Sequence, residues 1–174
     1  MAKKVLLVID MLRDFVYDDG ALTCGKPAQE IVPYIQSLLS DFRNAGDTVI
    51  YVADAHSQDD PEFNMWPPHC VKGTEGARVI DELRPEPGEP VVEKTRYSGF
   101  YRTDLDERLR KENPEEVHVV GVCTSICVLF TTADLRNRDY RTVVHERGVA
   151  DFDPEAHRFA LKHMEKVLGA RIQR

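Results

Sequence analysis

Short runs of apolar, mostly branched residues recur along this chain, and segments of a different character separate them. Five such runs cover residues 3–10 (KKVLLVID), 48–54 (TVIYVAD), 90–94 (PVVEK), 116–122 (EVHVVGV) and 141–146 (RTVVHE). Their length and composition predict buried β-strands. Because the runs are apolar on both faces rather than alternating, they predict a parallel sheet that is covered on both sides.

The segments between these runs predict the covering helices. Residues 27–45 place apolar residues at helical spacing and are followed by Gly46, a residue typical of helix ends. Further helices are expected over residues 78–84, 102–111, 124–138 and from Pro154 to near Gly169, the last one capped by Asp153. The alternation predicts one domain over residues 1–174 with a three-layer α/β fold of the open, doubly wound kind. In such folds, ligands bind beyond the carboxyl ends of the strands.

The net charge and the cysteines limit the kinds of partner. The chain has 174 residues, a formal net charge of −7 and a pI of about 5.4. An acidic chain argues against nucleic acid or an anionic membrane as partner, because both require a basic surface. No apolar run approaches the ~18 residues of a membrane-spanning helix, and Asp10 interrupts the first run too early for a signal peptide. We therefore expect a cytoplasmic protein whose cysteines, Cys24, Cys70, Cys123 and Cys127, are free thiols.

Three residues near the predicted strand ends form a candidate nucleophilic site. Asp10 and Lys94 each end an apolar run, where an unpaired charge is unfavourable. Cys127 lies where the fourth predicted strand gives way to a helix, for which Thr124 is the candidate cap. The free N–H groups of a first helical turn can lower the pKa of a thiol or hold an oxyanion. Packing or a buried ion pair explains each residue alone, but together they predict a catalytic cysteine with a carboxylate to accept its proton.

A second group of residues predicts a metal site. Asp54 and His56 are two residues apart in an extended segment, so their side chains point to the same side. His69 follows in a loop stiffened by two prolines, and Glu62 offers a further oxygen. Two imidazoles with one or two carboxylates suit one divalent metal ion, Zn²⁺, Mn²⁺ or Fe²⁺, without choosing among them. A solvated acidic loop explains the same residues equally well when this segment is considered alone.

Four longer stretches carry a resemblance to a known family. They are LLVIDMLRDF, the loop DAH…WPPHCVKGTEGA, EKTRYSGF and GVCTSICVLFTTAD. Together they resemble the nicotinamidase/pyrazinamidase branch of the isochorismatase-like cysteine hydrolases, nearly from end to end. The resemblance implies hydrolysis of nicotinamide to nicotinate and ammonia through a cysteine thioester, a step of NAD salvage and pyridine nucleotide biosynthesis. It also implies a homo-oligomer, with a small-molecule amide and neither nucleic acid nor membrane as partner.

Carried over position by position, the resemblance implies a role for each candidate catalytic residue. Asp10, Lys94 and Cys127 correspond to the catalytic triad of the family. The family has a cis peptide in the turn before its nucleophile, which corresponds here to the bond between Val122 and Cys123. The backbone N–H groups of Cys123 and Cys127 would then hold the oxyanion.

The same resemblance implies the metal ligands and the substrate pocket. The positions that match metal ligands are Asp54, His56, His69 and, as a fourth, Glu62. Phe15 and Trp66 correspond to the aromatic pair that encloses the pyridine ring. Tyr97 is expected to line the pocket. The metal ion would orient the pyridine nitrogen.

The chain departs from the commoner family pattern at three positions, and two other functions stay open. Cys123 stands where Ala is frequent, Ser125 where Asp is usual and Ile126 where the residue varies; Cys123 is interpreted as a spacer whose backbone matters rather than its thiol. A related cysteine hydrolase could act on another small amide or an isochorismate-like vinyl ether, although the metal loop argues against the latter. A thiol redox protein would use Cys123 and Cys127, four apart on a helix, but would leave Asp10 without a task.

Overall fold

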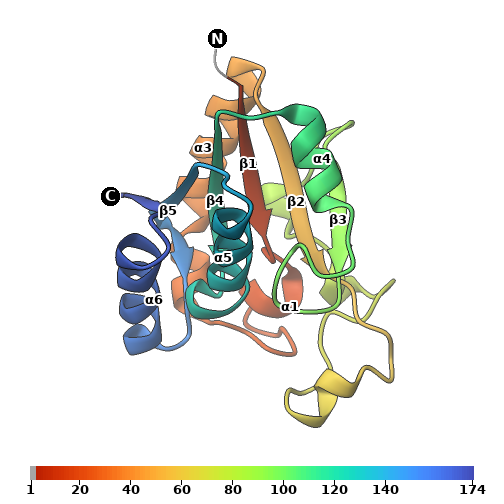
Figure 1. The fold of residues 1–174 in the computed structure, drawn as a ribbon. Coiled ribbons are helices and arrows are strands. Elements are labelled where there is room, and N and C mark those ends of the chain that lie inside the picture. The colour runs from red at the N-terminus through yellow and green to blue at the C-terminus, as the bar shows by residue number, and fades with distance from the viewer. Residues whose placement is uncertain (1–2) are drawn as a thin grey trace.

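A parallel sheet between two layers of helices makes up the computed structural model, which describes residues 3–174 (Figure 1). The six strands lie in the order β3-β2-β1-β4-β5-β6, and every pairing is parallel. Their bounds are β1 Lys4–Ile9, β2 Thr48–Asp54, β3 Val91–Lys94, β4 Glu116–Val122, β5 Thr142–Ala150 and β6 Arg171–Gln173. The predicted doubly wound α/β class is confirmed. Because the strand order reverses between β1 and β4, the carboxyl ends of these two strands flank the place where such folds bind ligands.

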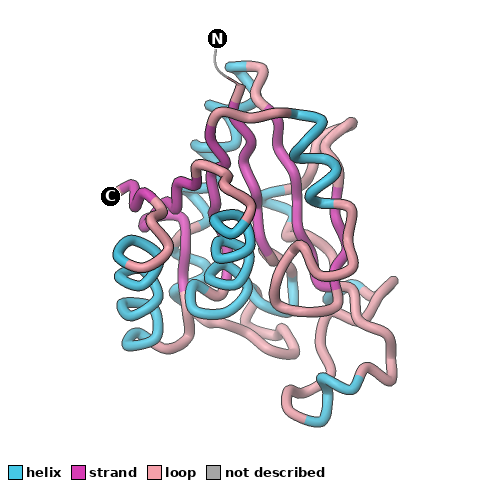
Figure 2. The backbone as a smooth tube through the Cα atoms, viewed as in Figure 1, coloured by secondary structure: helices cyan, strands magenta, loops and turns pink. Residues whose placement is uncertain are grey.

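Helices cover both faces of this sheet, as Figure 2 shows by colour. One face is covered by α1 (Arg13–Val16), α2 (Lys26–Glu30) and α3 (Val32–Ala45), and the other by α4 (Leu105–Glu112), α5 (Leu129–Asn137) and α6 (Pro154–Lys166). The central strand β1 serves both cores: Leu6 and Val8 pack with the first layer, whereas Leu7 and Ile9 pack with the second. This period of two explains why its sequence is apolar throughout.

Several helices begin or end elsewhere than predicted. The helix expected over residues 27–45 is divided at Ile31 into α2 and α3, because Pro33 in the first turn of α3 has no N–H to continue the hydrogen-bond ladder. Residues 78–84 form only a 3₁₀ turn, Asp81–Leu83, since Arg84 is extended before a proline. The start of α4 is at Leu105 and not at residue 102, where φ is positive.

Other boundaries follow the prediction more closely. Asp153 caps α6 as expected, and its carboxylate accepts the N–H groups of Glu155 and Ala156 at 2.8 and 3.2 Å. That helix ends at Lys166 rather than near Gly169. The elements α1 and β6 were not predicted, because four and three residues are too few for a periodic signal. Among residues 3–174, no helix has the length and apolar character needed to cross a membrane.

A long irregular segment joins β2 to β3. It includes 3₁₀ turns at Pro61–Asn64 and Glu75–Ala77 and projects beyond the carboxyl edge of the sheet, drawn in yellow at the lower right of Figure 1. A short parallel bridge between His56 and Val71 fastens the two sides of this segment to each other. Much of the segment is exposed, but His56 and His69, two of the predicted metal ligands, are buried within it.

Candidate active site

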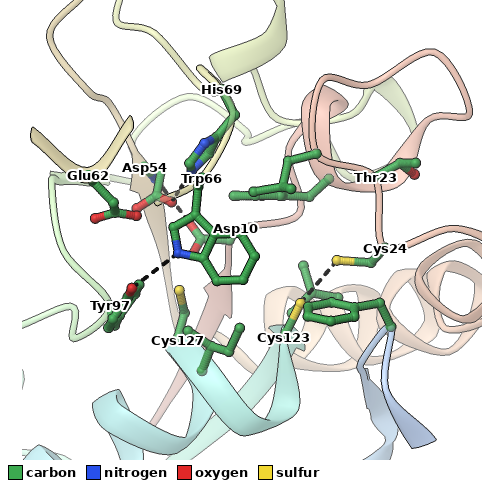
Figure 3. Close-up of a pocket in the computed structure, with 15 residues that line it drawn as sticks. Asp10, Thr23, Cys24, Asp54, Glu62, Trp66, His69, Tyr97, Cys123 and Cys127 are labelled. Atoms are coloured by element: carbon green, nitrogen blue, oxygen red, sulfur yellow. Dashed lines mark hydrogen bonds and ion pairs between the residues drawn. The ribbon is translucent and has the colours of Figure 1, made fainter. Parts of the chain in front are cut away.

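The residues expected at the strand ends meet at one edge of the sheet, and Figure 3 shows Asp10, Asp54 and Cys127 among them. Asp10 directly follows β1, Asp54 ends β2 and Lys94 ends β3. Cys127 lies in a π-helical turn, Thr124–Val128, that follows β4. All four side chains are buried. Neighbouring parallel strands end at the same edge, so residues from distant parts of the chain converge there.

Lys94 is the centre of this group. Its Nζ atom lies 2.9 Å from Oδ2 of Asp10 and 3.5 Å from Sγ of Cys127, and it also donates to the carboxylate of Asp54. The backbone carbonyl of Arg96 accepts a further hydrogen bond from it at 3.0 Å. One buried ammonium therefore pairs with two buried carboxylates and contacts the thiol, so the charges of the group do not fully cancel.

The backbone around Asp10 fixes its carboxylate. The residue has a φ of 51°, its N–H donates to the carbonyl of Val52 at 2.8 Å, and its Oδ1 accepts the N–H of Asp54 at 2.8 Å. Its Oδ2 forms the ion pair with Lys94, but no donor within residues 3–174 makes a well-aligned hydrogen bond to that oxygen. A lone pair of Oδ2 is therefore free to accept a proton.

Burial determines the protonation of the group. It raises the pKa of Asp10 to about 6, an effect that Asp54 increases and Lys94 opposes. Burial also raises the pKa of the Cys127 thiol well above its usual value, and Lys94 offsets this only in part. This direction is opposite to the one expected from the helix start, because burial and the carboxylates of Asp10 and Asp54 disfavour the thiolate. A thiol with a raised pKa must lose its proton during any attack by the sulfur.

A close approach of β4 to β1 positions the turn that carries Cys127. Gly121 has a φ of 123°, and a Cβ atom at this position would lie 1.9 Å from the carbonyl oxygen of Ile9. Only glycine fits so near a neighbouring backbone. The peptide bond between Val122 and Cys123 is cis, and the carbonyl of Cys123 then accepts two hydrogen bonds from the π-helical turn.

Thr124 does not cap this turn, contrary to the prediction. Its hydroxyl lies 2.8 Å from Nδ1 of His157 on α6 instead. The carboxylate of Asp151, which follows β5, caps the turn instead: its Oδ2 accepts the N–H of Ser125 at 2.8 Å. A negative charge therefore lies at the start of the turn although Ser125 itself carries none.

The four residues predicted to bind a metal are also close together. Nε2 of His56 lies 3.5 Å and Nε2 of His69 lies 3.9 Å from Oδ2 of Asp54. Candidate ligand atoms of these three residues are all within 4.8 Å of one another. Oε1 of Glu62 is 4.0 Å from Nε2 of His56. The group lies directly beside Asp10 and is reached from the same cavity.

Hydrogen bonds orient both imidazoles for a metal ion. Nδ1 of His56 donates to Oδ2 of Asp60 at 2.9 Å, and Nδ1 of His69 donates to the carbonyl of Pro67 at 2.7 Å. In a neutral ring the opposite nitrogen, Nε2, then carries a lone pair, and that of His56 has no hydrogen-bond partner within residues 3–174. A carboxylate or carbonyl behind each ring is the usual support of a metal-binding histidine. The donor set therefore fits a divalent cation.

The nearby carboxylates and thiol offer no competing site. Asp10, Asp54 and Cys127 also bring possible ligand atoms together. The Lys94 ammonium already contacts all three of them, so the positive charge that they favour is supplied by the protein. A metal ion is expected on the histidine side of Asp54.

An apolar cavity of about 210 Å³ extends from the triad. The three aromatic residues predicted for the pocket, Phe15, Trp66 and Tyr97, all line it. Trp66 donates its indole N–H to the hydroxyl of Tyr97 at 3.2 Å, as the dashed line in Figure 3 marks. Aromatic walls beside a polar floor suit a flat ring that bears one polar group.

Two residues of the site, Asp60 and Phe152, were missed by sequence reasoning. Asp60 supports His56 and also accepts hydrogen bonds from Arg96 at 3.0 and 3.1 Å. Its position four residues after His56 was the available signal. Phe152 lines the cavity, and its ring contacts Trp66 at a centroid distance of 6.5 Å. No local pattern marks Phe152, which becomes part of the site only through the end of β5.

The cysteines are arranged differently from the redox alternative. The Sγ atoms of Cys24 and Cys123 are 3.0 Å apart, and both residues line the cavity. The thiol beside Cys123 is thus that of Cys24, whereas the thiol of Cys127 contacts Lys94. Cys70 is fully buried, with its sulfur 3.9 Å from the carbonyl of Gly76.

The sequence and the fold of this chain are similar to those of known proteins. A family model for the isochorismatase domain matches residues 4–173. The uncharacterized isochorismatase family protein PncA of Bacillus subtilis is 43% identical over 180 residues, which cover 98% of each chain. A crystal structure of nicotinamidase/pyrazinamidase PncA from Bacillus subtilis matches with a TM-score of 0.94 at 41% identity and covers 99% of this chain and 100% of that one. The pyrazinamidase of Pyrococcus horikoshii, solved in complex with zinc, has a TM-score of 0.93 at 28% identity over 99% of each chain. From the family model, the sequence identity and the shared fold we conclude that this chain belongs to the isochorismatase family.

Proposed function

We propose that this protein is a single-domain amidohydrolase that converts nicotinamide to nicotinate and ammonia through a thioester on Cys127. The observation that carries the proposal is the place of Asp10 and Cys127 at the floor of an aromatic cavity, in contact with the buried Lys94 and beside a group of possible metal-ligating side chains. The relatives named as nicotinamidases and pyrazinamidases support an amide on a nitrogen-containing ring as the substrate.

The shape of the cavity supports this substrate. A volume of about 210 Å³ is suited to one six-membered ring with a small substituent. We infer that the ring lies between Phe15 and Trp66, with Tyr97 on the rim. The amide then points to the buried end of the cavity, where Cys127 lies. The ring nitrogen points to the group formed by Asp54 and the two histidines.

The first chemical step moves a proton and forms a bond to sulfur. Oδ2 of Asp10 accepts the thiol proton as Sγ of Cys127 attacks the amide carbon. Lys94 holds the Asp10 carboxylate in place and stabilises negative charge on both partners. Backbone N–H groups of Cys123 and Cys127 donate to the oxygen of the tetrahedral intermediate.

The second half of the reaction returns the enzyme to its resting state. Asp10 donates the proton to the departing ammonia, which leaves a thioester between Cys127 and the ring carbonyl. The Asp10 carboxylate then accepts a proton from water as the water attacks the thioester, and Cys127 recovers its proton when nicotinate leaves. A pKa of about 6 suits a group that both accepts and donates a proton near neutral pH.

A divalent metal ion is part of the proposal. Asp54, His56 and His69, with Glu62, would hold it. When bound, such an ion supplies a Lewis acid that orients the pyridine ring through its nitrogen. The residues do not choose among Zn²⁺, Mn²⁺ and Fe²⁺.

Release of ammonia from nicotinamide tests the proposal. Purified protein is stripped with a chelator and reloaded separately with Zn²⁺, Mn²⁺ and Fe²⁺, and Cys127→Ala is assayed in parallel. We expect turnover that depends on the metal and is lost in the variant. Turnover by Cys127→Ala within a few fold of the unchanged protein would contradict the nucleophile. If the folded, metal-loaded protein does not hydrolyse nicotinamide, the substrate of the same reaction is another small amide.

Self-association is a further part of the proposal. Exposed apolar side chains on α5 and α6, those of Phe130 and Phe159, and of Val167 just after α6, favour contact with a second copy. Sedimentation at micromolar concentration measures the assembly. A monomer at all concentrations would contradict it.

A further inference from the structure

Two thiols lie side by side in the wall of the cavity, away from the triad. The Sγ atoms of Cys24 and Cys123 are 3.0 Å apart although 99 residues separate them in the chain, and Figure 3 marks the contact. Both residues line the cavity and are 5% and 9% exposed. Neither forms a disulfide in this structure. The pair is thus packed in the protein and still open to a small molecule that enters the cavity.

The backbone holds both sulfur atoms where they are. The N–H of Cys24 donates to the carbonyl of Phe15 at 2.8 Å, so this cysteine is anchored to α1. Cys123 follows the cis peptide and begins the turn that carries Cys127. A disulfide has an S–S length of about 2.05 Å, so the two sulfur atoms need to approach by only about 1 Å.

The two thiols share one hydrogen bond, in which either sulfur can be the donor. Whichever sulfur an electrophilic oxidant reaches first therefore has the other within 3.0 Å.

We propose that Cys24 and Cys123 are a reversible oxidation site that a hydroperoxide converts into a disulfide in the wall of the cavity. The sulfur of one cysteine attacks one peroxide oxygen; the O–O bond breaks, and a sulfenic acid and water, or an alcohol, are formed. The sulfur of the other cysteine then attacks the sulfenic sulfur, the S–O bond breaks, and water leaves with the thiol proton. The two sulfurs lose two electrons in all, and the peroxide gains them.

The disulfide has a consequence for the proposed reaction. It would tie the segment behind Phe15 to the residue that opens the turn of Cys127 and would draw Cys123 toward that segment. The N–H of Cys123 is one of the two inferred oxyanion donors, and a shift of about 1 Å in such a group can reduce turnover up to about 100-fold. This consequence rests on the proposed function, whereas formation of the disulfide does not.

The chemistry is tested first in Cys127→Ala, where the inferred nucleophile cannot react with the oxidant. The protein, which keeps three of the four cysteines, is treated with a small excess of hydrogen peroxide and its mass is measured before and after reduction by dithiothreitol. We expect a loss of about 2 Da, reversed by dithiothreitol, and a peptide that joins Cys24 to Cys123. The matched control adds Cys24→Ser and should give neither.

Other products overturn the proposal. A protein whose three thiols all survive treatment would show that the cavity does not admit the oxidant to the pair. Gain of oxygen at Cys24 or Cys123 without loss of both thiols would show that the sulfurs do not join. A disulfide to Cys70 would show that the pairing is not the one in the structure.

Activity is measured separately, in protein with Cys127 intact. After brief oxidation and removal of peroxide, we expect turnover of nicotinamide to fall about 10- to 100-fold and to return with dithiothreitol; full turnover by cross-linked protein would overturn the consequence for catalysis. Cys24→Ser distinguishes this from oxidation of the nucleophile, because its activity should not show the reversible loss. If the protein does not hydrolyse nicotinamide at all, the proposed function fails while the mass measurement still decides on the disulfide.

Discussion

The ammonium nitrogen of Lys94 lies 3.5 Å from the sulfur of Cys127, and both side chains are buried. The same nitrogen is paired with the carboxylates of Asp10 and Asp54. Lys94 therefore has a structural role as well as its inferred chemical one. It is the cation that allows two acidic side chains to lie next to each other in the interior.

Replacing Lys94 should consequently affect stability and activity together. Lys94→Met keeps the length of the side chain but leaves two buried carboxylates unpaired, so we expect the free energy of unfolding to fall by about 3–5 kcal/mol. Turnover should be lost. Denaturant unfolding followed by circular dichroism measures the first effect, and ammonia release measures the second.

Asp10→Asn is the matched control for this variant. It removes one of the two carboxylates and leaves Lys94 paired with Asp54, so it should unfold at a higher denaturant concentration than Lys94→Met does. Turnover should still be lost, because an amide cannot accept the thiol proton. Equal stability of Lys94→Met and the unchanged protein would show that the ion pairs contribute nothing to the fold.

Asp60 should control the affinity for metal without binding it. Its carboxylate accepts the N–H of Nδ1 of His56 and is held in turn by Arg96. Asp60→Ala removes that support, and we expect the affinity for Zn²⁺ to fall about 10- to 100-fold. Competition with a chromophoric chelator measures the affinity directly and does not depend on activity.

Arg96→Gln serves as the comparison for Asp60→Ala. It leaves the bond between His56 and Asp60 intact, so the loss of affinity should be smaller. His69→Ala removes a proposed ligand and should have the largest effect of the three. An unchanged affinity in His69→Ala would exclude this residue from the metal site.

The approach of β4 to β1 requires glycine at position 121. In Gly121→Ala the new methyl group would lie 1.9 Å from the carbonyl oxygen of Ile9, a contact that only a shift of one strand can relieve. We expect little soluble folded protein, or a marked loss of stability and turnover. Thermal unfolding and the yield of folded protein measure the effect.

Gly46→Ala separates the steric cause from the backbone cause. Gly46 also has a positive φ, 73°, but a Cβ there meets nothing within 4 Å. Only the cost of a left-handed conformation remains, about 1–2 kcal/mol. Gly121→Ala should be the more damaging of the two; the reverse order would contradict the role assigned to the close approach.

The residues at the carboxyl edge of the sheet were predictable because the sequence next to each of them identifies it. Asp10 and Lys94 each end an apolar run, and strand ends of a parallel sheet share one edge, so their convergence with Cys127 follows from the fold class. The predicted strands were therefore enough to indicate which distant residues meet. The helix begins at Thr124 as predicted, but its cap was not predictable in the same way, because the Asp151 carboxylate that accepts the N–H of Ser125 comes from beyond β5.

Contacts that depend on side-chain packing could not be predicted from the sequence. Cys24 lies in an irregular segment, and nothing near it indicates that its sulfur meets Cys123, 99 residues later. The pKa of Cys127 was also not predictable. The position of this thiol at a helix start suggested a lowered pKa, whereas its burial, a property of the whole fold, raises the pKa. Patterns along the chain predict elements and their order, but the solvent exposure of a single atom depends on all of them.

A buried pair of histidines far from the cavity makes stability depend on pH. Nδ1 of His118 lies 2.8 Å from Nε2 of His145, whose Nδ1 lies 2.8 Å from the hydroxyl of Tyr34. Burial lowers the pKa of both rings to about 4. The positive charge of Arg171 lowers both pKa values further, whereas Glu116 raises that of His118. Since a ring-to-ring hydrogen bond needs one acceptor, the two rings cannot both be protonated in this geometry.

At these two histidines the unfolded chain binds more protons than the folded chain between pH 6.5, the usual pKa of histidine, and pH 4. They should therefore make the free energy of unfolding fall as the pH is lowered through this window, by up to about 1.4 kcal/mol per pH unit for each histidine; Asp10, whose pKa is raised to about 6, acts in the opposite direction. Urea unfolding at several pH values measures the slope. The double variant His118→Gln, His145→Gln has no ring to protonate in either state and should lose the contribution of the histidines to the slope, whatever its absolute stability. The same slope in both proteins would show that these histidines are protonated as readily in the fold as outside it.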